Sequence, residues 1–168
     1  MCSFTEAIKT DLLKSKNRKK LLEDLRLIIE FLNHQYNLIT YLIMKKVTGL
    51  GGVFFKCDNP KNMNDWYSKN LGLATSDYGA VFRWRDADDP SKEGATAWCA
   101  FPQNAKNFNP STKQFMINYR VENLVELVDE LKKEDVNVID EIADSDYGKF
   151  VHILDPEGNI IELWEPKD

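Results

Sequence analysis

Cysteine and histidine are scarce in this chain of 168 residues, which has three cysteines and two histidines. Cys2, Cys57 and Cys99 lack the close spacing of a zinc site or a disulfide framework, which favours a reducing compartment. No apolar run is long enough to span a membrane, and the first residues lack the basic and apolar regions of a signal peptide. We therefore expect a cytoplasmic protein with no membrane partner.

Basic residues are outnumbered by acidic ones over most of the chain, and the net charge is −5. The first 44 residues hold seven Lys and Arg against five Asp and Glu, whereas the remainder holds 15 against 22. Because an acidic domain repels a phosphate backbone, we expect no nucleic acid partner. The same charge favours a cationic small molecule.

Residues 1–43 differ in pattern from the rest of the chain. A basic run at 14–20 precedes apolar residues at helical spacing, which predicts one or two amphipathic helices. The apolar residues are Leu21, Leu22, Leu25, Ile28, Ile29 and Leu32. This helical extension could bind a partner or a membrane surface, or pack on its own domain or on a dimer mate. It could also lie outside the native fold, because Met44 leads directly into the first strand of a domain at 44–168.

An internal repeat extends from Thr48 to Pro166. In each half a strand pattern leads into a helix pattern, at 53–71 and at 117–131. Short strand patterns follow, near Leu73, 80–85 and 95–101 in the first half and near 136–139, 150–154 and 160–165 in the second. The repeat predicts an α+β fold of two tandem βαβββ modules, at about 48–102 and 114–166, joined by a linker at 103–113.

The last predicted hairpin turns through the sequence Asp-Pro-Glu-Gly-Asn at 155–159, a strong turn signal. Strand alternation places Glu162 between Ile160 and Trp164 on one face. A carboxylate among apolar residues needs a partner or a cavity, unless it is an edge-strand residue that faces water.

This hairpin and the repeat resemble those of the vicinal oxygen chelate superfamily, which includes glyoxalase I, extradiol dioxygenases, fosfomycin-resistance enzymes and bleomycin-resistance proteins. The resemblance implies two curved sheets that form a cup-like cavity, and it implies a homodimer. Apolar residues on the second face of the sheets also favour pairing, among them Val53, Phe55, Ile117 and Tyr119.

The resemblance also implies four metal-ligand positions, which here are Gly52, Trp98, Met116 and Glu162. Only Glu162 could bind a divalent cation, and one carboxylate is too few, so we expect no metal and no other cofactor. His152 is predicted to lie one strand away from Glu162 and to hydrogen-bond with it. The metal-dependent reactions of the superfamily are therefore disfavoured.

Alternation along the strands, assumed to be free of bulges, predicts a cavity lined by aromatic and polar side chains. The predicted ligand-binding residues are Phe54, Lys56, Phe82, Trp84, Trp98, Asn118, Arg120 and Trp164. Alternatively, the aromatic residues fill the cup as a core, and the two cationic residues lie at solvated strand edges.

Three functions follow from this pattern. The favoured one is a bleomycin-resistance-like protein that binds a small planar or aromatic molecule without a metal. The alternative is a lyase- or isomerase-type enzyme in which His152 and Glu162 act as a catalytic acid–base pair on a carbonyl substrate. The third is an interaction module whose N-terminal helix recruits a partner.

Overall fold

The structure is a computed structural model that describes residues 18–36 and 46–167. The chain divides into two units, Met1–Met44 and Lys45–Asp168. In the first unit, residues 18–36 form a helix, which confirms the predicted N-terminal helix, and its leucine and isoleucine side chains are exposed. The rest of the predicted extension, at 1–17 and 37–43, lies outside the described residues. No helix in the described ranges is long and apolar enough to cross a membrane.

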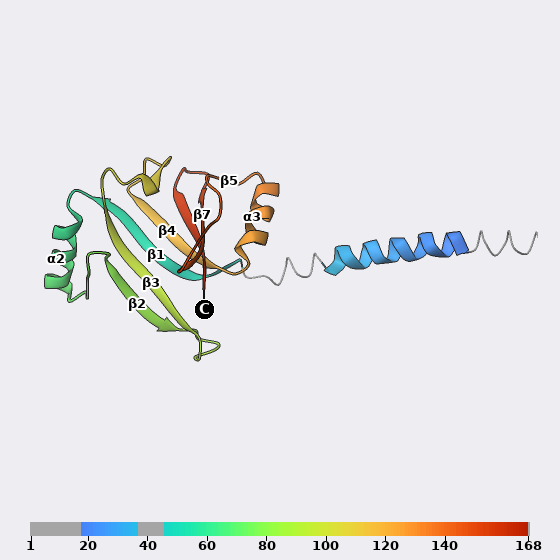
Figure 1. Cartoon of the computed structure of the whole chain (residues 1–168), viewed down its shortest axis with the longest axis horizontal. Coiled ribbons are helices and arrows are strands. Elements are labelled where there is room, and N and C mark those ends of the chain that lie inside the picture. Colours follow the sequence, from blue (N-terminus) through green and yellow to red (C-terminus); the bar gives the residue numbers. More distant parts are fainter. Residues whose placement is uncertain (1–17, 37–45, 168) are drawn as a thin grey trace, which may run out of the picture. The chain divides into compact units, whose positions relative to one another are not determined.

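The second unit is an α+β domain, as predicted (Figure 1). Its elements are β1 (Val47–Cys57), α2 (Pro60–Leu71), β2 (Ala80–Arg85), β3 (Glu93–Pro102), the 3-10 helix η1 (Lys106–Phe108), β4 (Phe115–Val121), α3 (Leu124–Lys133), β5 (Asn137–Val138), β6 (Ala143–Ser145), β7 (Gly148–Leu154) and β8 (Ile160–Pro166). The strands form one eight-stranded sheet in the order β2-β3-β1-β4-β8-β7-β5, and β6 pairs with β7.

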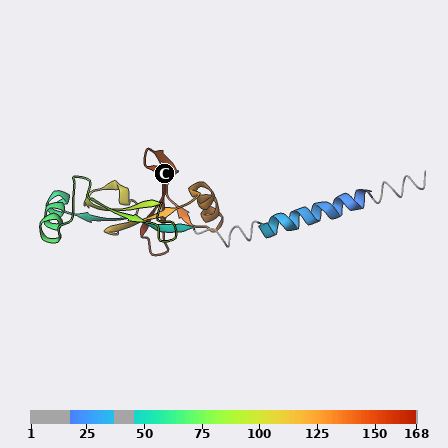
Figure 2. The ribbon, with the colours of Figure 1, turned by 90° about the horizontal axis from the view of Figure 1, so that it is seen from below.

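The two modules repeat the same pairing pattern. In the first, β1 runs parallel to β3, and in the second, β4 runs parallel to β8. The antiparallel pair β1–β4 joins the modules at the centre of the sheet. The helices α2 and α3 lie at opposite ends of the domain (Figure 2). The strand predicted near Leu73 is wrong, because the described residues between α2 and β2 form only an isolated bridge, Ser76–Gly79.

The two helices begin in different ways. The side chain of Asn59 caps α2, since its Oδ1 accepts a hydrogen bond from the Asn62 N–H at 2.9 Å, and Pro60 suits the first turn. Asn123 provides no such cap for α3. Instead, Glu165 Oε2 on β8 accepts the Leu124 N–H at 2.9 Å. The start of α3 therefore depends on a strand that is distant in sequence.

One face of the sheet, here called the helix face, is covered by α2 and α3. Helix α2 packs on β3, and α3 packs on β5 and β8. Burial of apolar side chains under α3 forms the larger core, which comprises Val121, Leu124, Leu127, Val128, Val151, Ile153 and Leu163.

The opposite face, here called the open face, is closed at one end by the linker between the modules. Phe108 of η1 is fully buried and packs against Phe54, Met116 and Ile160. Ser111 of the same linker donates a hydrogen bond to the Gly158 carbonyl at 2.6 Å. This cluster of Phe108, Phe54, Met116 and Ile160 is here called the Phe108 plug. Polar side chains occupy the open face beyond it.

Candidate functional site

Three polar side chains lie in one row across β4, β8 and β7 on the open face. The register pairs Asn118 with Glu162, and Glu162 with His152. Asn118 Nδ2 donates a hydrogen bond to Glu162 Oε1 at 2.6 Å. His152 Nε2 lies 3.1 Å from Glu162 Oε2, without the alignment of a regular hydrogen bond. The structure therefore brings together the two residues that strand alternation predicts as neighbours.

A fourth polar side chain, that of Asp140, contacts this row from the loop between β5 and β6. Its Oδ1 accepts the backbone N–H of His152 at 2.7 Å, and its Oδ2 lies 2.6 Å from His152 Nδ1. No sequence pattern distinguishes Asp140 from its neighbour Glu141, so Asp140 is not among the predicted site residues. The imidazole is thus held between two carboxylates, and we call Asp140, His152, Glu162 and Asn118 the polar centre.

Electrostatics at the polar centre favour a protonated histidine. Burial lowers the pKa of His152, but the close contact with Glu162, the hydrogen bond with Asp140 and the negative charges of both carboxylates outweigh burial and raise it above its ordinary value. Cys99 lies near this charge, and burial, together with Glu162, raises the pKa of its thiol. Cys99 is therefore a poor nucleophile.

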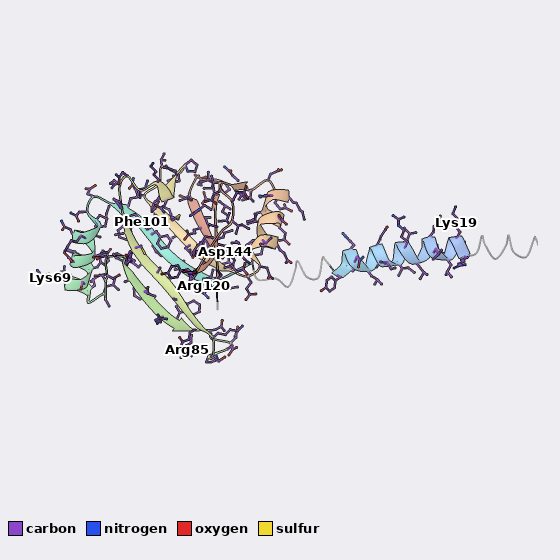
Figure 3. All side chains as sticks on the ribbon, in the orientation of Figure 1. Lys19, Lys69, Arg85, Phe101, Arg120 and Asp144 are labelled. Atoms are coloured by element: carbon purple, nitrogen blue, oxygen red, sulfur yellow. The ribbon has the colours of Figure 1, made fainter. Side chains whose placement is uncertain are left out.

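Aromatic and cationic side chains form a second group beside the polar centre. Arg120 and Trp164 follow Asn118 and Glu162 by two residues on the same strands, so they share the open face. The Arg120 guanidinium lies 4.9 Å from the ring centroid of Trp164 and 5.5 Å from that of Trp84. Arg120 is labelled in Figure 3, where it extends from the central strands.

Contacts on either side hold the two indoles in place. Trp164 stacks on Phe150 with ring centroids 5.9 Å apart and an interplanar angle of 5°, and its Nε1–H donates to the Tyr147 carbonyl. The Nε1–H of Trp84 donates to Thr96 Oγ1 at 3.0 Å. We call Trp84, Arg120, Trp164 and Phe150 the aromatic row.

Two cavities meet at Arg120. The larger, about 660 Å³, is bordered by Trp84, Arg120 and the carboxylates of Asp86, Glu93, Glu122 and Glu165. The smaller, about 280 Å³, is bordered by Arg83, Arg120, Tyr147, Trp164 and Lys167, among others. Their sizes fall around the range of small-molecule pockets, and their walls combine aromatic surface with charge.

Trp98 lies on the helix face, so the prediction that it shares a face with Trp164 is wrong. The register pairs Trp98 with Val53, and its ring packs on Tyr67 of α2 at 4.6 Å and on Phe55 at 5.1 Å. Cys99 pairs with Phe54 as Glu162 pairs with Asn118, so Cys99 takes the open-face position that was predicted for Trp98.

Four other predicted ligand-binding residues border neither cavity: Asn118, which belongs to the polar centre, and Phe54, Lys56 and Phe82. Phe54 belongs to the buried core, with 9% of its surface exposed, and it packs edge-on against Phe101. Lys56 places its ammonium 4.9 Å from the Phe108 ring centroid, so the linker covers this end of the face. Phe82 is exposed on the edge strand β2. Other side chains of the same protein fill the space beside Phe54 that a ligand would need.

The polar centre does not fit a divalent metal ion. Asn118 turns its amide N–H, and not its oxygen, toward Glu162, and both ring nitrogens of His152 face carboxylates. Within the described ranges, no group of three or more His, Cys, Asp or Glu side chains could hold a metal ion. The expectation that the protein works without a metal stays a prediction.

The sequence and the fold now establish the family. A sequence model of the Glyoxalase/Bleomycin resistance protein/Dioxygenase superfamily matches residues 50–163. Because this match covers more than half of the chain, the protein belongs to that superfamily. A comparison with curated protein sequences found no match.

Solved structures share the fold at low sequence identity. A methylmalonyl-CoA epimerase variant from Streptomyces coelicolor, in complex with 2-nitronate-propionyl-CoA, is 14% identical, with a TM-score of 0.54 over 73% of this chain and 99% of that chain. A methylmalonyl-CoA epimerase in complex with methylmalonyl-CoA and NH4+ is also 14% identical, with a TM-score of 0.53 over 71% and 95%. At such identity the likeness shows the fold alone.

Proposed function

We propose that this protein binds a small planar or aromatic molecule at the aromatic row, without a bound metal. The single observation that supports the proposal is the position of Arg120, whose guanidinium lies over Trp84 and Trp164 where the two cavities meet. A flat ligand in either cavity would meet indole surface and a fixed positive charge. Such ring contacts contribute about 0.5–1.5 kcal/mol each beyond the area they bury.

The charges around the larger cavity refine the proposal. Four carboxylates border it, against the two cations Lys92 and Arg120. Glu93 is paired with Arg85, and Glu165 contacts Lys149 at 3.3 Å, and the lining as a whole carries more carboxylates than cations. A flat ligand with a positively charged group fits this border better than an anionic one.

Binding of the flat cation proflavine, followed by tryptophan fluorescence and calorimetry, tests this function. The comparison probes are 1-naphthoate, which is flat and anionic, and cyclohexylammonium, which is cationic but not flat. Proflavine should bind most tightly, and Trp84→Leu or Trp164→Leu should weaken it about tenfold, the loss of one good ring contact. The matched control is Trp66→Leu, because Trp66 is exposed on α2 and borders neither cavity.

A parent protein that binds none of the flat probes would overturn the proposal. An equal loss of affinity in the Trp66 variant would also contradict it, because the contact would then lie elsewhere. Thermal unfolding of each variant shows whether the loss of binding reflects a loss of fold.

The second candidate function is a lyase- or isomerase-type enzyme that acts on a carbonyl compound. The observation that favours it is the polar centre, where a half-buried histidine with a raised pKa lies between two carboxylates. Methylmalonyl-CoA, the ligand of a protein with this fold, is one carbonyl compound to assay. Turnover that His152→Gln abolishes, with proflavine binding unchanged, would separate this function from simple binding.

A further inference from the structure

The His152 ring is hydrogen-bonded on one side and in contact with a second carboxylate on the other. Asp140 Oδ2 is 2.6 Å from Nδ1, and Glu162 Oε2 is 3.1 Å from Nε2. Asp140 also accepts the backbone N–H of the same residue, so it fixes both the position of the strand and the rotation of the ring. The side chains of His152 and Glu162 are only 19% and 15% exposed, so their contact is largely shielded from water, whereas the side chain of Asp140 is 47% exposed.

These contacts determine where protons can lie. An ionised carboxylate only accepts hydrogen bonds, so the short contact to Asp140 requires a proton on Nδ1. On the other side of the ring, a bare Nε2 would hold its lone pair 3.1 Å from a carboxylate oxygen of Glu162, and two acceptors at that distance repel each other. One proton must therefore lie between Nε2 and Glu162 Oε2. The other oxygen of Glu162, Oε1, already accepts the Asn118 N–H, so the proton shared with the ring lies at Oε2.

We infer that Asp140 is a positioning residue, which holds His152 with its Nδ1 protonated, and that His152 and Glu162 share one further proton in the resting protein. The centre can then give a proton to a carbonyl or carboxylate oxygen of a bound molecule, but it cannot accept one first. When it gives the proton, Nε2 loses it, the acceptor oxygen gains it, and a neutral imidazole remains with its Nδ1–H on Asp140.

This inference changes the role expected for His152 from general base to proton donor. Nε2 itself is buried, so the proton reaches a bound molecule by way of the Glu162 carboxyl group. Cys99 on β3 also lies near Glu162, and burial and that charge raise the pKa of its thiol, which stays neutral. The inference does not rest on ligand binding, since the shared proton belongs to the free protein.

Nitrogen-15 NMR of the full chain tests the proton positions directly, because the two ring nitrogens have different shifts in each protonation state. The chain has two histidines, so a His34→Gln variant assigns the signals. Near neutral pH, His152 should show both nitrogens protonated. In Glu162→Gln the ring should become neutral with its proton on Nδ1, and in Asp140→Asn the doubly protonated form should decrease at least severalfold.

The matched control is Asp144→Asn, since Asp144 pairs with Lys167 and is exposed. This variant should leave the His152 signals unchanged. A neutral His152 with its proton on Nε2 in the parent would overturn the inference. So would an Asp140→Asn variant that unfolds at a lower temperature but keeps the parent signals, because Asp140 would then be structural only. If Asp140→Asn does not fold, an Nε2 proton in Glu162→Gln overturns the inference by itself.

Discussion

Glu165 Oε2 on the last strand accepts the backbone N–H of Leu124 at 2.9 Å, across 41 residues of sequence. It takes the place of a side-chain cap, which Asn123 does not provide, and its charge suits the positive end of the helix dipole. Lys149 contacts the same oxygen at 3.3 Å. The second helix of the domain is thus held to the sheet by a polar contact as well as by its apolar core.

Replacing Glu165 with Ala should therefore lower the free energy of unfolding by about 0.5–2 kcal/mol, the usual cost of losing a helix cap. Urea unfolding followed by circular dichroism measures the change. Glu141→Ala is the control, because Glu141 is exposed and outside the helix. Equal stability of the two variants would show that the cap contributes nothing.

The Phe108 plug should contribute more to the free energy of unfolding than the Glu165 cap does. Its ring is fully buried between the modules, so Phe108→Ala leaves a cavity that the surrounding Phe54, Met116 and Ile160 cannot fill, at a cost of about 3–5 kcal/mol. Phe82→Ala, on an exposed edge-strand residue, should change stability by only about 0.5 kcal/mol. Similar unfolding midpoints for the two variants would contradict this role of the linker.

The alternation of side chains along the strands predicts three of the four residues of the polar centre. Alternation places Asn118, His152 and Glu162 on one face because β4, β8 and β7 pair without a register shift. Asp140 and Phe108 come from irregular segments, whose contacts depend on the tertiary fold and leave no periodic signal. The fold class and the module repeat are therefore predictable, whereas the residues that complete the site from loops are not.

The misplacement of Trp98 has a different cause. The register of a parallel strand pair such as β1–β3 is not set by a short turn, and a slip of one residue moves a side chain to the other face. Strand β1 also contains two irregularities, between Val47 and Gly49 and between Leu50 and Gly52. Such bulges shift the side-chain alternation on which the predicted cavity lining depends.

A homodimer stays a prediction, and its sequence basis is weaker in the light of the fold. Phe55 packs on Trp98, and Tyr119 packs against the core under α3, so these residues are engaged within one chain. Exposed Val81 and Phe82 on the edge strand β2 remain available to a second copy. Sedimentation velocity at micromolar concentration should show a dimer, and a single monomer boundary would refute the expectation.

The raised pKa of His152 predicts a definite pH dependence of stability. A group whose pKa is higher in the folded protein stabilises the fold when it is protonated, so its contribution is complete below the ordinary histidine value of 6.5. The contribution decreases as the pH rises through the folded pKa. The difference in unfolding free energy between the parent and His152→Gln should therefore be largest in acid and shrink toward alkaline pH. A difference that grows with pH would have the wrong sign.

Gly51 gives the sharpest steric test of the site. It lies in the irregular part of β1, and a Cβ at this position would overlap Asn118 Oδ1 and crowd the Trp164 ring. Gly51→Ala should therefore displace the Asn118 amide from Glu162 and cost about 1–3 kcal/mol, the range for overpacking. Gly49→Ala is the matched control, because the nearest atom to its Cβ is in Trp84 at 3.7 Å, an ordinary contact. Urea unfolding should show the loss for the first variant only, and proflavine affinity should fall with it. Equal losses for both glycines would indicate a general cost of alanine in this strand, and not a close contact with Asn118.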